Sequence, residues 1–217
     1  MQKLMARRIP IKRSRKQLKI DLENYREKAL ALGASDARVI PASFAVIDER
    51  VRPKCTVPRC HLYGESANCP PYTPSLAEMR KVVRRYGHAL AFKTEVTPKE
   101  DFVDDDKWHV AHMVHQKKIH DIAGAIEALA FNDGYYFAAG FAAGGCKTAL
   151  CAGQICQVLD SGRCRFPLKS RPSMEAVGID VFGLAIKLGW EVYPVAVRDV
   201  DPESIGCAIS VGIVFVT

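Results

Sequence analysis

Seven of the eight cysteines lie in two short groups, and these groups are the strongest chemical signal in the sequence. The first group has three members and the second has four: Cys55, Cys60 and Cys69, then Cys146, Cys151, Cys156 and Cys164. In a reducing compartment such grouping indicates metal binding or catalysis rather than disulfides. Metal-binding cysteines lose their protons, and adjacent thiolates need a cation to neutralise them. We therefore expect both groups to bind metal.

The second group supplies four thiolates, enough for one complete site. Zinc and iron–sulfur clusters both accept four cysteines. Zinc sites favour paired C-x2-C hooks, and this sequence contains none. A sequential run of cysteines followed by Pro167 is similar in plan to ferredoxin loops. The spacing predicts an iron–sulfur cluster of the 4Fe-4S type, one or two in number, with zinc as the alternative.

The first group supplies only three thiolates, so a fourth ligand must come from elsewhere. The candidates are His61, water, a substrate, or Cys207 brought in by the fold. An incompletely ligated iron could act as a Lewis acid, which leaves open whether the protein is an enzyme. Cys207 occupies the apolar side of an alternating C-terminal segment, where we expect core packing in preference to metal ligation.

Four histidines, His109, His112, His115 and His120, fall in one predicted helix. Three of them share a broad face, which is compatible with metal binding or proton transfer, although their polar neighbours favour a solvated helix surface. The H-E-x-x-H pattern of zinc hydrolases is absent.

Three charged residues follow the second cysteine group. Glu175 and Asp180 lie near a predicted helix start, where acids stabilise the helix dipole. Arg171 precedes them and would either compensate an anionic cluster or lie exposed.

The elements that must position these residues follow an α/β pattern. We expect about four helices, at residues 18–32, 75–86, 107–132 and 173–188. We expect about five strands interleaved with them, at residues 36–47 with an interruption at Pro41, and at 89–92, 135–141, 190–197 and 205–215. Both cysteine groups would then lie in loops that follow strands.

Composition indicates a globular protein, because 48% of the residues are hydrophobic and only 25% are charged. We divide the chain into a basic N-terminal arm, residues 1–20, and a single α/β metal-binding domain, residues 21–217. The arm carries eight basic and no acidic residues, so the rest of the chain is almost neutral although the net charge is +7. Aromatic residues do not interleave its charges, which favours a solvated arm over nucleic-acid binding. The sequence shows no apolar run long enough for membrane insertion and no secretory signal, so we expect a cytoplasmic location.

Longer stretches resemble a known family. They are Cys60-His-Leu-Tyr-Gly-Glu-Ser-Ala-Asn-Cys69-Pro-Pro-Tyr-Thr-Pro, Gly134-Tyr135-Tyr136 leading to Gly145-Cys146, and Cys164-Arg-Phe-Pro-Leu-Lys-Ser-Arg-Pro-Ser-Met-Glu-Ala-Val-Gly-Ile-Asp-Val. They resemble the prokaryotic domain-of-unknown-function family described as predicted metal-binding proteins, over most of the chain after about residue 20. That family tends to space its middle cysteines as C-x2-C-x2-C, whereas both gaps here are four residues. The resemblance implies an iron–sulfur protein of anaerobic metabolism and names no substrate.

Three functions remain open at this point. The first is electron transfer through an iron–sulfur cluster, with a redox partner protein. The second is an enzyme that uses an incompletely ligated cluster as a Lewis acid on a small-molecule substrate. The third is a zinc-stabilised binding module. The sequence does not decide the oligomeric state.

Overall fold

The computed structural model describes residues 8–10, 14–103, 105–195 and 200–217, without the side chains of residues 105–112. Its strands are β1 (Asp36–Pro41), β2 (His88–Glu95), β3 (Ala139–Phe141) and β4 (Ile209–Phe215). They form one sheet in the order β1-β2-β4-β3, and every neighbouring pair is antiparallel. The last strand in sequence, β4, therefore lies inside the sheet between β2 and β3.

The α-helices of the described residues are α1 (Arg15–Ala31), α2 (Leu76–Val83), α3 (Glu100–Val103), α4 (Asp105–Asn132), α5 (Cys146–Leu150), α6 (Gln157–Ser161) and α7 (Val181–Lys187). Short 3-10 turns occur at Ala42–Phe44, Arg52–Cys55, Glu175–Val177 and Pro202–Ser204. No described helix has the length and apolar character needed to cross a lipid bilayer.

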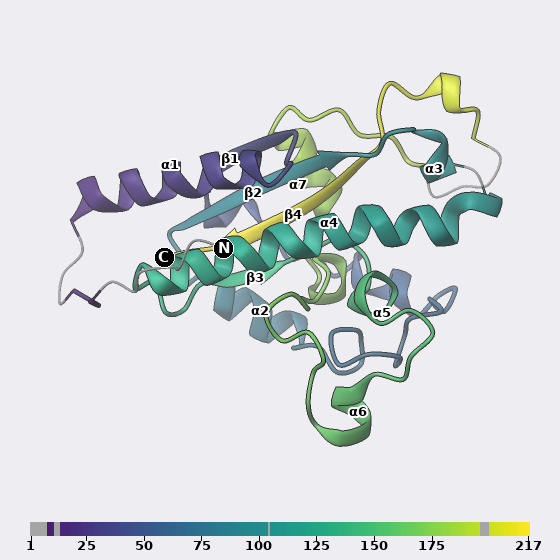
Figure 1. Cartoon of the computed structure of the whole chain (residues 1–217), viewed down its shortest axis with the longest axis horizontal. Coiled ribbons are helices and arrows are strands. Elements are labelled where there is room, and N and C mark those ends of the chain that lie inside the picture. Colours follow the sequence, from purple (N-terminus) through teal and green to yellow (C-terminus); the bar gives the residue numbers. More distant parts are fainter. Residues whose placement is uncertain (1–7, 11–13, 104, 196–199) are drawn as a thin grey trace.

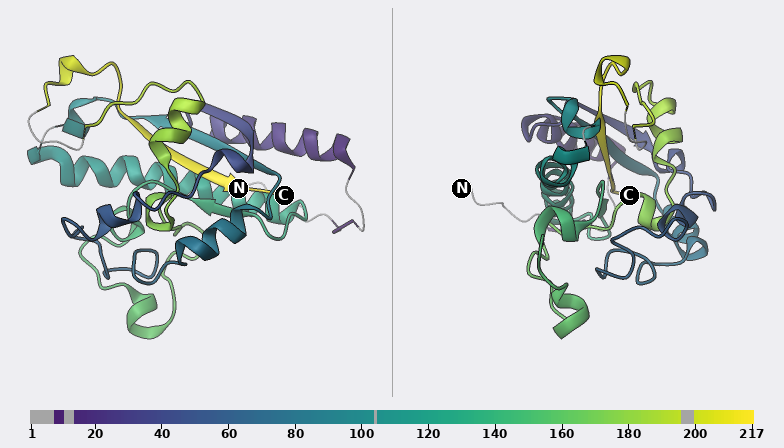
Figure 2. Two further views of the ribbon diagram at one scale, coloured as in Figure 1. Left: turned by 180° about the vertical axis from the view of Figure 1, so that it is seen from behind. Right: turned by 90° about the vertical axis from the view of Figure 1, so that its right-hand side faces the viewer.

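The sheet lies between two layers of helices (Figures 1 and 2). Both faces of the sheet can be covered because successive side chains of a strand point to opposite faces. On β2, Leu90 and Phe92 pack with residues of α1 and α4. On the same strand, Ala89 and Ala91 pack with residues of α2 and α7. Both faces of the sheet are therefore buried, and the cysteine loops lie at one end of this core.

Two crossed tyrosine–aspartate pairs join α1 to the end of α4. The hydroxyl of Tyr25 donates to Asp133 Oδ2 at 3.0 Å, and the hydroxyl of Tyr135 donates to Asp21 Oδ2 at 2.9 Å. All four residues are buried. Burial, followed by the charge of Asp133, raises the pKa of Tyr25, so its hydroxyl keeps its proton. Each buried carboxylate thus receives a hydrogen bond from the opposite segment.

The α/β class predicted from the sequence is confirmed. The sheet of the described residues has four strands, whereas the sequence predicted about five. Residues 190–195 form no strand, and residues 196–199 lie outside the described part of the chain. Trp190 is buried, and its indole donates to Asp36 Oδ2 at 2.7 Å. The predicted helix at 173–188 is also interrupted, because Gly178 has φ of 84° and ends the 3-10 turn before α7 begins.

Candidate metal centre

The first cysteine loop, residues 51–74, contains turns whose backbone hydrogen bonds involve its own cysteines. The amide of Cys60 donates to the carbonyl of Cys55 at 3.0 Å, and the amide of Leu62 donates to Cys60 Sγ at 3.5 Å. The amide of Cys69 donates to the carbonyl of Ser66 at 3.0 Å. These short-range contacts hold the three cysteines of this loop in a compact arrangement.

The second cysteine loop, residues 144–171, is anchored to α4. Glu127 on α4 accepts two hydrogen bonds from the guanidinium of Arg171, at 2.6 and 2.8 Å. The backbone amide of Arg171 donates to His120 Nδ1 at 3.4 Å. A Cβ at Gly124 would overlap the carbonyl of Leu168, so a glycine there permits the close approach of this loop.

The two cysteine loops contact each other directly. The amide nitrogen Nδ2 of Asn68 lies 3.4 Å from Cys146 Sγ and 2.7 Å from Ser170 Oγ. A Cβ at Gly145 would overlap Leu62 and lie 3.9 Å from the sulfur of Cys69. Figure 2 shows the two loops side by side below the helical layers. Thiols separated by a large part of the chain are thereby brought to one region.

Ser66, a buried residue of the first loop, contacts thiols from both loops. Cys146 Sγ lies 3.7 Å from the hydroxyl oxygen of Ser66. The same hydroxyl forms a hydrogen bond with Cys69. Burial raises the pKa of Cys69 to about 11, and the neighbouring thiols of Cys146 and Cys60 add to the rise. Without a cation nearby, this thiol stays protonated at neutral pH.

The pKa of the Cys156 thiol is lowered, in contrast to that of Cys69. Burial opposes its ionisation, but backbone amides of Ala67, Leu159 and Val158, together with the charge of Lys147, lower the pKa of its thiol. Ala67 belongs to the first loop, so its amide is another link between the loops. Hydrogen bonds to a thiolate favour the charged form that binds metal.

Cations lie beside two further thiols, those of Cys151 and Cys55. Burial raises the pKa of Cys151, while a hydrogen bond from Arg165 lowers it in part. Burial and the neighbouring thiol of Cys60 raise the pKa of Cys55, and the charge of Arg52 acts in the other direction. Arg171, the compensating charge considered from the sequence, is instead engaged by Glu127.

Cys207 lies apart from both groups. It precedes β4, whereas the sequence placed it on that strand, and it is half-buried. Its sulfur lies 3.4 Å from the carbonyl oxygen of Glu191. Burial and the charge of Glu191 raise the pKa of this thiol. Cys207 therefore does not supply the missing ligand of the first group.

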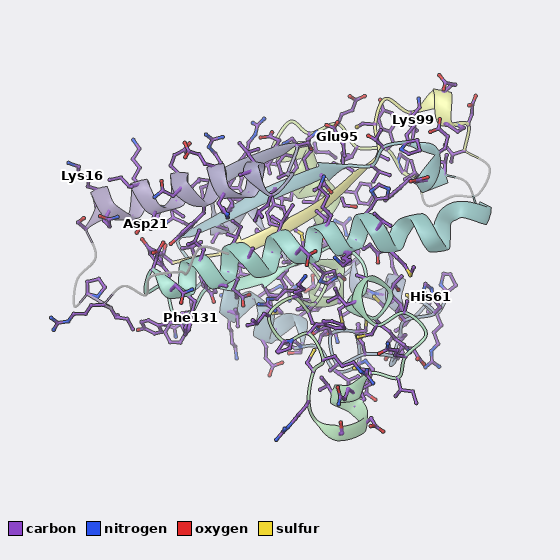
Figure 3. All side chains as sticks on the ribbon, in the orientation of Figure 1. Lys16, Asp21, His61, Glu95, Lys99 and Phe131 are labelled. Atoms are coloured by element: carbon purple, nitrogen blue, oxygen red, sulfur yellow. The ribbon has the colours of Figure 1, made fainter. Side chains whose placement is uncertain are left out.

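The two helix histidines whose side chains the structure describes, His115 and His120, have separate environments. His115 Nε2 lies 3.1 Å from Asp101 Oδ2. His120 is fully buried, and burial lowers its pKa to about 4. The side chains of His109 and His112 lie outside the described residues. His61 is exposed at the outer edge of the first loop (Figure 3).

The two acids behind the second loop have separate environments. Asp180 caps α7, where its side chain accepts the amide of Gly183 at 2.9 Å, as a helix-start acid should. Glu175 lies in a 3-10 turn, where burial raises the pKa of its carboxyl, and its charge acts on Cys55. Glu175 is therefore a neighbour of the first group.

The donor chemistry of this region fits a cysteine-bound metal centre. All eight cysteines are free, and backbone amides donate to the sulfurs of Cys60 and Cys164 at 3.5 and 3.3 Å. Among the residues that the structure describes, no three His, Cys, Asp or Glu side chains form a group that could hold a metal ion.

Sequence reasoning missed three members of this region: Ser66, Asn68 and Gly145. All three lie in the stretches that resemble the family, but their contacts join residues far apart in the chain, so local spacing gave them no role.

Comparison with known proteins gives one family. The model of the family described as "Predicted metal-binding protein (DUF2284)" matches residues 38–209. No curated protein and no solved structure matches the chain.

Proposed function

This chain belongs to the DUF2284 family of predicted metal-binding proteins, and from that premise we propose that its two cysteine loops hold iron–sulfur clusters that carry electrons. The observation behind the proposal is the contact between the loops, which gathers free thiols from residues 55–69 and 146–164. When bound, a cluster accepts and releases single electrons.

Thiolate number and spacing favour iron–sulfur over zinc. Seven cysteines in contacting loops exceed the four that one zinc ion takes. Zinc thus remains the alternative outcome of the metal analysis.

The residues around the thiols would tune such a centre. Amide donors at Leu62, Phe166 and Ala67 reach sulfurs of three different cysteines. Hydrogen bonds to cluster sulfurs stabilise the more negative, reduced state and raise the reduction potential. Lys147 and Arg165 act in the same direction through their charge.

The exposure of the second loop suits exchange of electrons with a partner. Cys156 and Cys164 are half-buried, and Ile155, which immediately precedes Cys156, is 73% exposed. An exposed apolar side chain beside a redox centre is a suitable contact for a redox partner protein. We therefore place electron exit at this loop.

Anaerobic purification followed by analysis of iron, acid-labile sulfide and zinc tests the proposal. We expect iron and sulfide in near-equal amounts, and an electron paramagnetic resonance (EPR) signal after reduction. Stoichiometric zinc without sulfide would replace the proposal by a zinc-binding module.

Two serine variants provide a matched comparison. Cys69→Ser removes a buried thiol of the loop contact, and we expect it to lower the iron content. Cys207→Ser removes the thiol outside both groups, and its iron content should equal that of the wild type. Equal iron in both variants would show that the first loop is not a metal site.

A further inference from the structure

We infer that Cys146 is the fourth ligand of the first group, so that the seven thiols divide into Cys55, Cys60, Cys69 and Cys146, and Cys151, Cys156 and Cys164. This inference rests on the proposed function and assigns ligands within it. Position in the sequence would instead place Cys146 with the three cysteines that follow it. Three features of the structure associate Cys146 with the first group.

The first is contact with the opposite loop. Cys146 Sγ lies 3.4 Å from Asn68 Nδ2 and 3.7 Å from Ser66 Oγ. Ser66 also forms a hydrogen bond with Cys69, so one hydroxyl contacts both thiols. Asn68 is the immediate neighbour of Cys69 in the chain. The polar contacts of Cys146 are thus made with the residues that surround Cys69.

The second is burial. Cys69 and Cys146 are each 7% exposed, whereas the other five cysteines of the two groups are half-buried. Gly145 contributes to this, because its missing side chain admits Leu62 and leaves the sulfur of Cys69 3.9 Å from the position of a Cβ. The two buried thiols are therefore neighbours in the interior, where the two loops meet.

The third is the geometry of α5. Cys146 is its first residue and Cys151 is its C-cap, so the two cysteines lie at opposite ends of the helix. Five residues of α-helix correspond to a rise of about 7.5 Å and a rotation of about 140° between the two side chains. Cys151 contacts Arg165 and lies near both Cys146 and Cys164, so it also reaches the rest of the second loop.

This division moves the incomplete site from the first loop to the second. Cys151, Cys156 and Cys164 would leave one position of their metal centre for a ligand from outside the seven thiols. Arg165 lies beside Cys151, and Lys147, which is ion-paired with Glu65, lies near Cys156. The chemistry therefore favours a small anion with oxygen donors at Arg165. Substrate chemistry, if the protein has any, would then take place at the second loop.

Pairwise serine variants test the division through iron and sulfide content. If the inference holds, Cys69→Ser, Cys146→Ser and the double variant of these two lose the same cluster and retain the other. The double variant Cys146→Ser with Cys151→Ser loses both clusters. Retention of one cluster by that second double variant, with loss of both when Cys69 and Cys146 are replaced, would overturn the inference.

The same variants decide the matter if the wild type holds a single cluster. Loss of that cluster in Cys69→Ser and Cys146→Ser, but not in Cys151→Ser, supports the division. Loss in Cys146→Ser and Cys151→Ser, but not in Cys69→Ser, overturns it. Absence of iron and sulfide from the wild type itself would instead reject the proposed function.

A crosslinking experiment on the wild-type chain avoids variants that fail to fold. Brief oxidation of the metal-free protein with diamide joins thiols that are neighbours, and peptide mass spectrometry identifies the pairs. We expect a Cys69–Cys146 disulfide as the main product. A predominant Cys146–Cys151 disulfide would contradict the shared position of the two buried thiols.

Discussion

At the scale of single residues, the thiols of this chain are chemically unequal. In the metal-free protein we expect iodoacetamide to modify Cys156 faster than Cys207 at neutral pH. Both are half-buried, but the pKa of Cys156 is lowered, while burial and Glu191 raise that of Cys207. Alkylation requires the thiolate, so the thiol with the lower pKa reacts first.

Timed labelling with peptide mass spectrometry measures both rates in one sample. Raising the pH should accelerate the reaction of Cys207 more than that of Cys156. Equal rates at neutral pH would mean that the amide of Ala67 does not reach Cys156 in solution, and the contact between the loops would lose one of its supports.

The buried side chain of His120 leads to a second prediction at the residue scale, about how stability depends on pH. Its pKa is about 4 in the folded protein, below the usual value of 6.5 because the ring is buried. The unfolded chain therefore binds a proton first, and the stability from neutral His120 is lost as the pH falls from 6.5 toward 4. The loss is on the order of 2–3 kcal/mol at the acid end.

Urea unfolding of the wild type and of His120→Asn across this pH range isolates the effect. The variant retains a hydrogen-bonding side chain but gains no proton, so its free energy of unfolding should fall less with acid. Parallel curves for the two proteins would assign the acid sensitivity to other groups.

At the scale of elements, Gly124 shows how α4 positions the second loop. Alanine stabilises an α-helix by about 1 kcal/mol relative to glycine. Gly124→Ala should nevertheless destabilise the protein, by about 1–3 kcal/mol, because its Cβ would overlap the carbonyl of Leu168. We also expect a lower iron content, since the displaced segment carries Cys164.

Gly87→Ala is the matched control, because the nearest atom to its Cβ, the carbonyl oxygen of Thr217, is 3.6 Å away. Urea unfolding and iron analysis of both variants check the prediction. A Gly124→Ala protein as stable as the wild type would show that the second loop does not pack on α4 as described.

The crossed pairs between α1 and the end of α4 give another prediction. Tyr25→Phe removes the hydroxyl that donates to Asp133 and leaves a buried carboxylate without that donor. The free energy of unfolding should fall by about 1–3 kcal/mol. Tyr136→Phe, at a residue 51% exposed, should change it little. Chemical denaturation measures both, and equal effects would argue against the buried pairing.

Regular elements were predictable where the sequence repeats clearly. The helix expected at 18–32 corresponds to α1, and Ser75 caps α2 through a capping box with Glu78, as its position predicts. Elements depending on tertiary contact were not. Residues 190–195 have the sequence pattern of a strand but form none. Trp190, the first of them, is fixed by a hydrogen bond to Asp36, which is 154 positions away in the chain.

The candidate site was also predictable from the sequence only in part. Clustered cysteines are visible in the sequence because metal ligands cluster along the chain, and the family match supports metal binding. The polar residues between the loops are not visible, because Asn68 and Ser66 reach Cys146 across 78 and 80 positions. The ligand set itself stays a prediction.

At the scale of the whole molecule, the cysteine loops lie outside the two main hydrophobic clusters, although the second loop packs on α4. The two main hydrophobic clusters involve the sheet and its helices, whereas the tip of the second loop around residues 152–155 is exposed. Removal of metal should leave the helical circular dichroism largely intact. Limited proteolysis should then cleave the metal-free protein within residues 51–74 or 144–171.

The iron-loaded protein should resist cleavage at those sites, because bound metal joins the chain on either side of each cut. Mass spectrometry of the fragments distinguishes the outcomes. Loss of all protected fragments on metal removal would show that the centre stabilises the entire domain, and identical patterns with and without metal would show that it does not order the loops.

The place of β4 in the sheet has a consequence for biosynthesis. This strand separates β2 from β3, so the ribosome completes both cysteine segments before the sheet beneath them can close. A nascent chain would expose its thiols to oxygen and stray metals throughout that interval. For the proposed cluster, delivery of iron and sulfide is therefore best timed after residues 209–215 have paired with the sheet, and a chain that stalls before residue 209 would offer an assembly factor no stable platform.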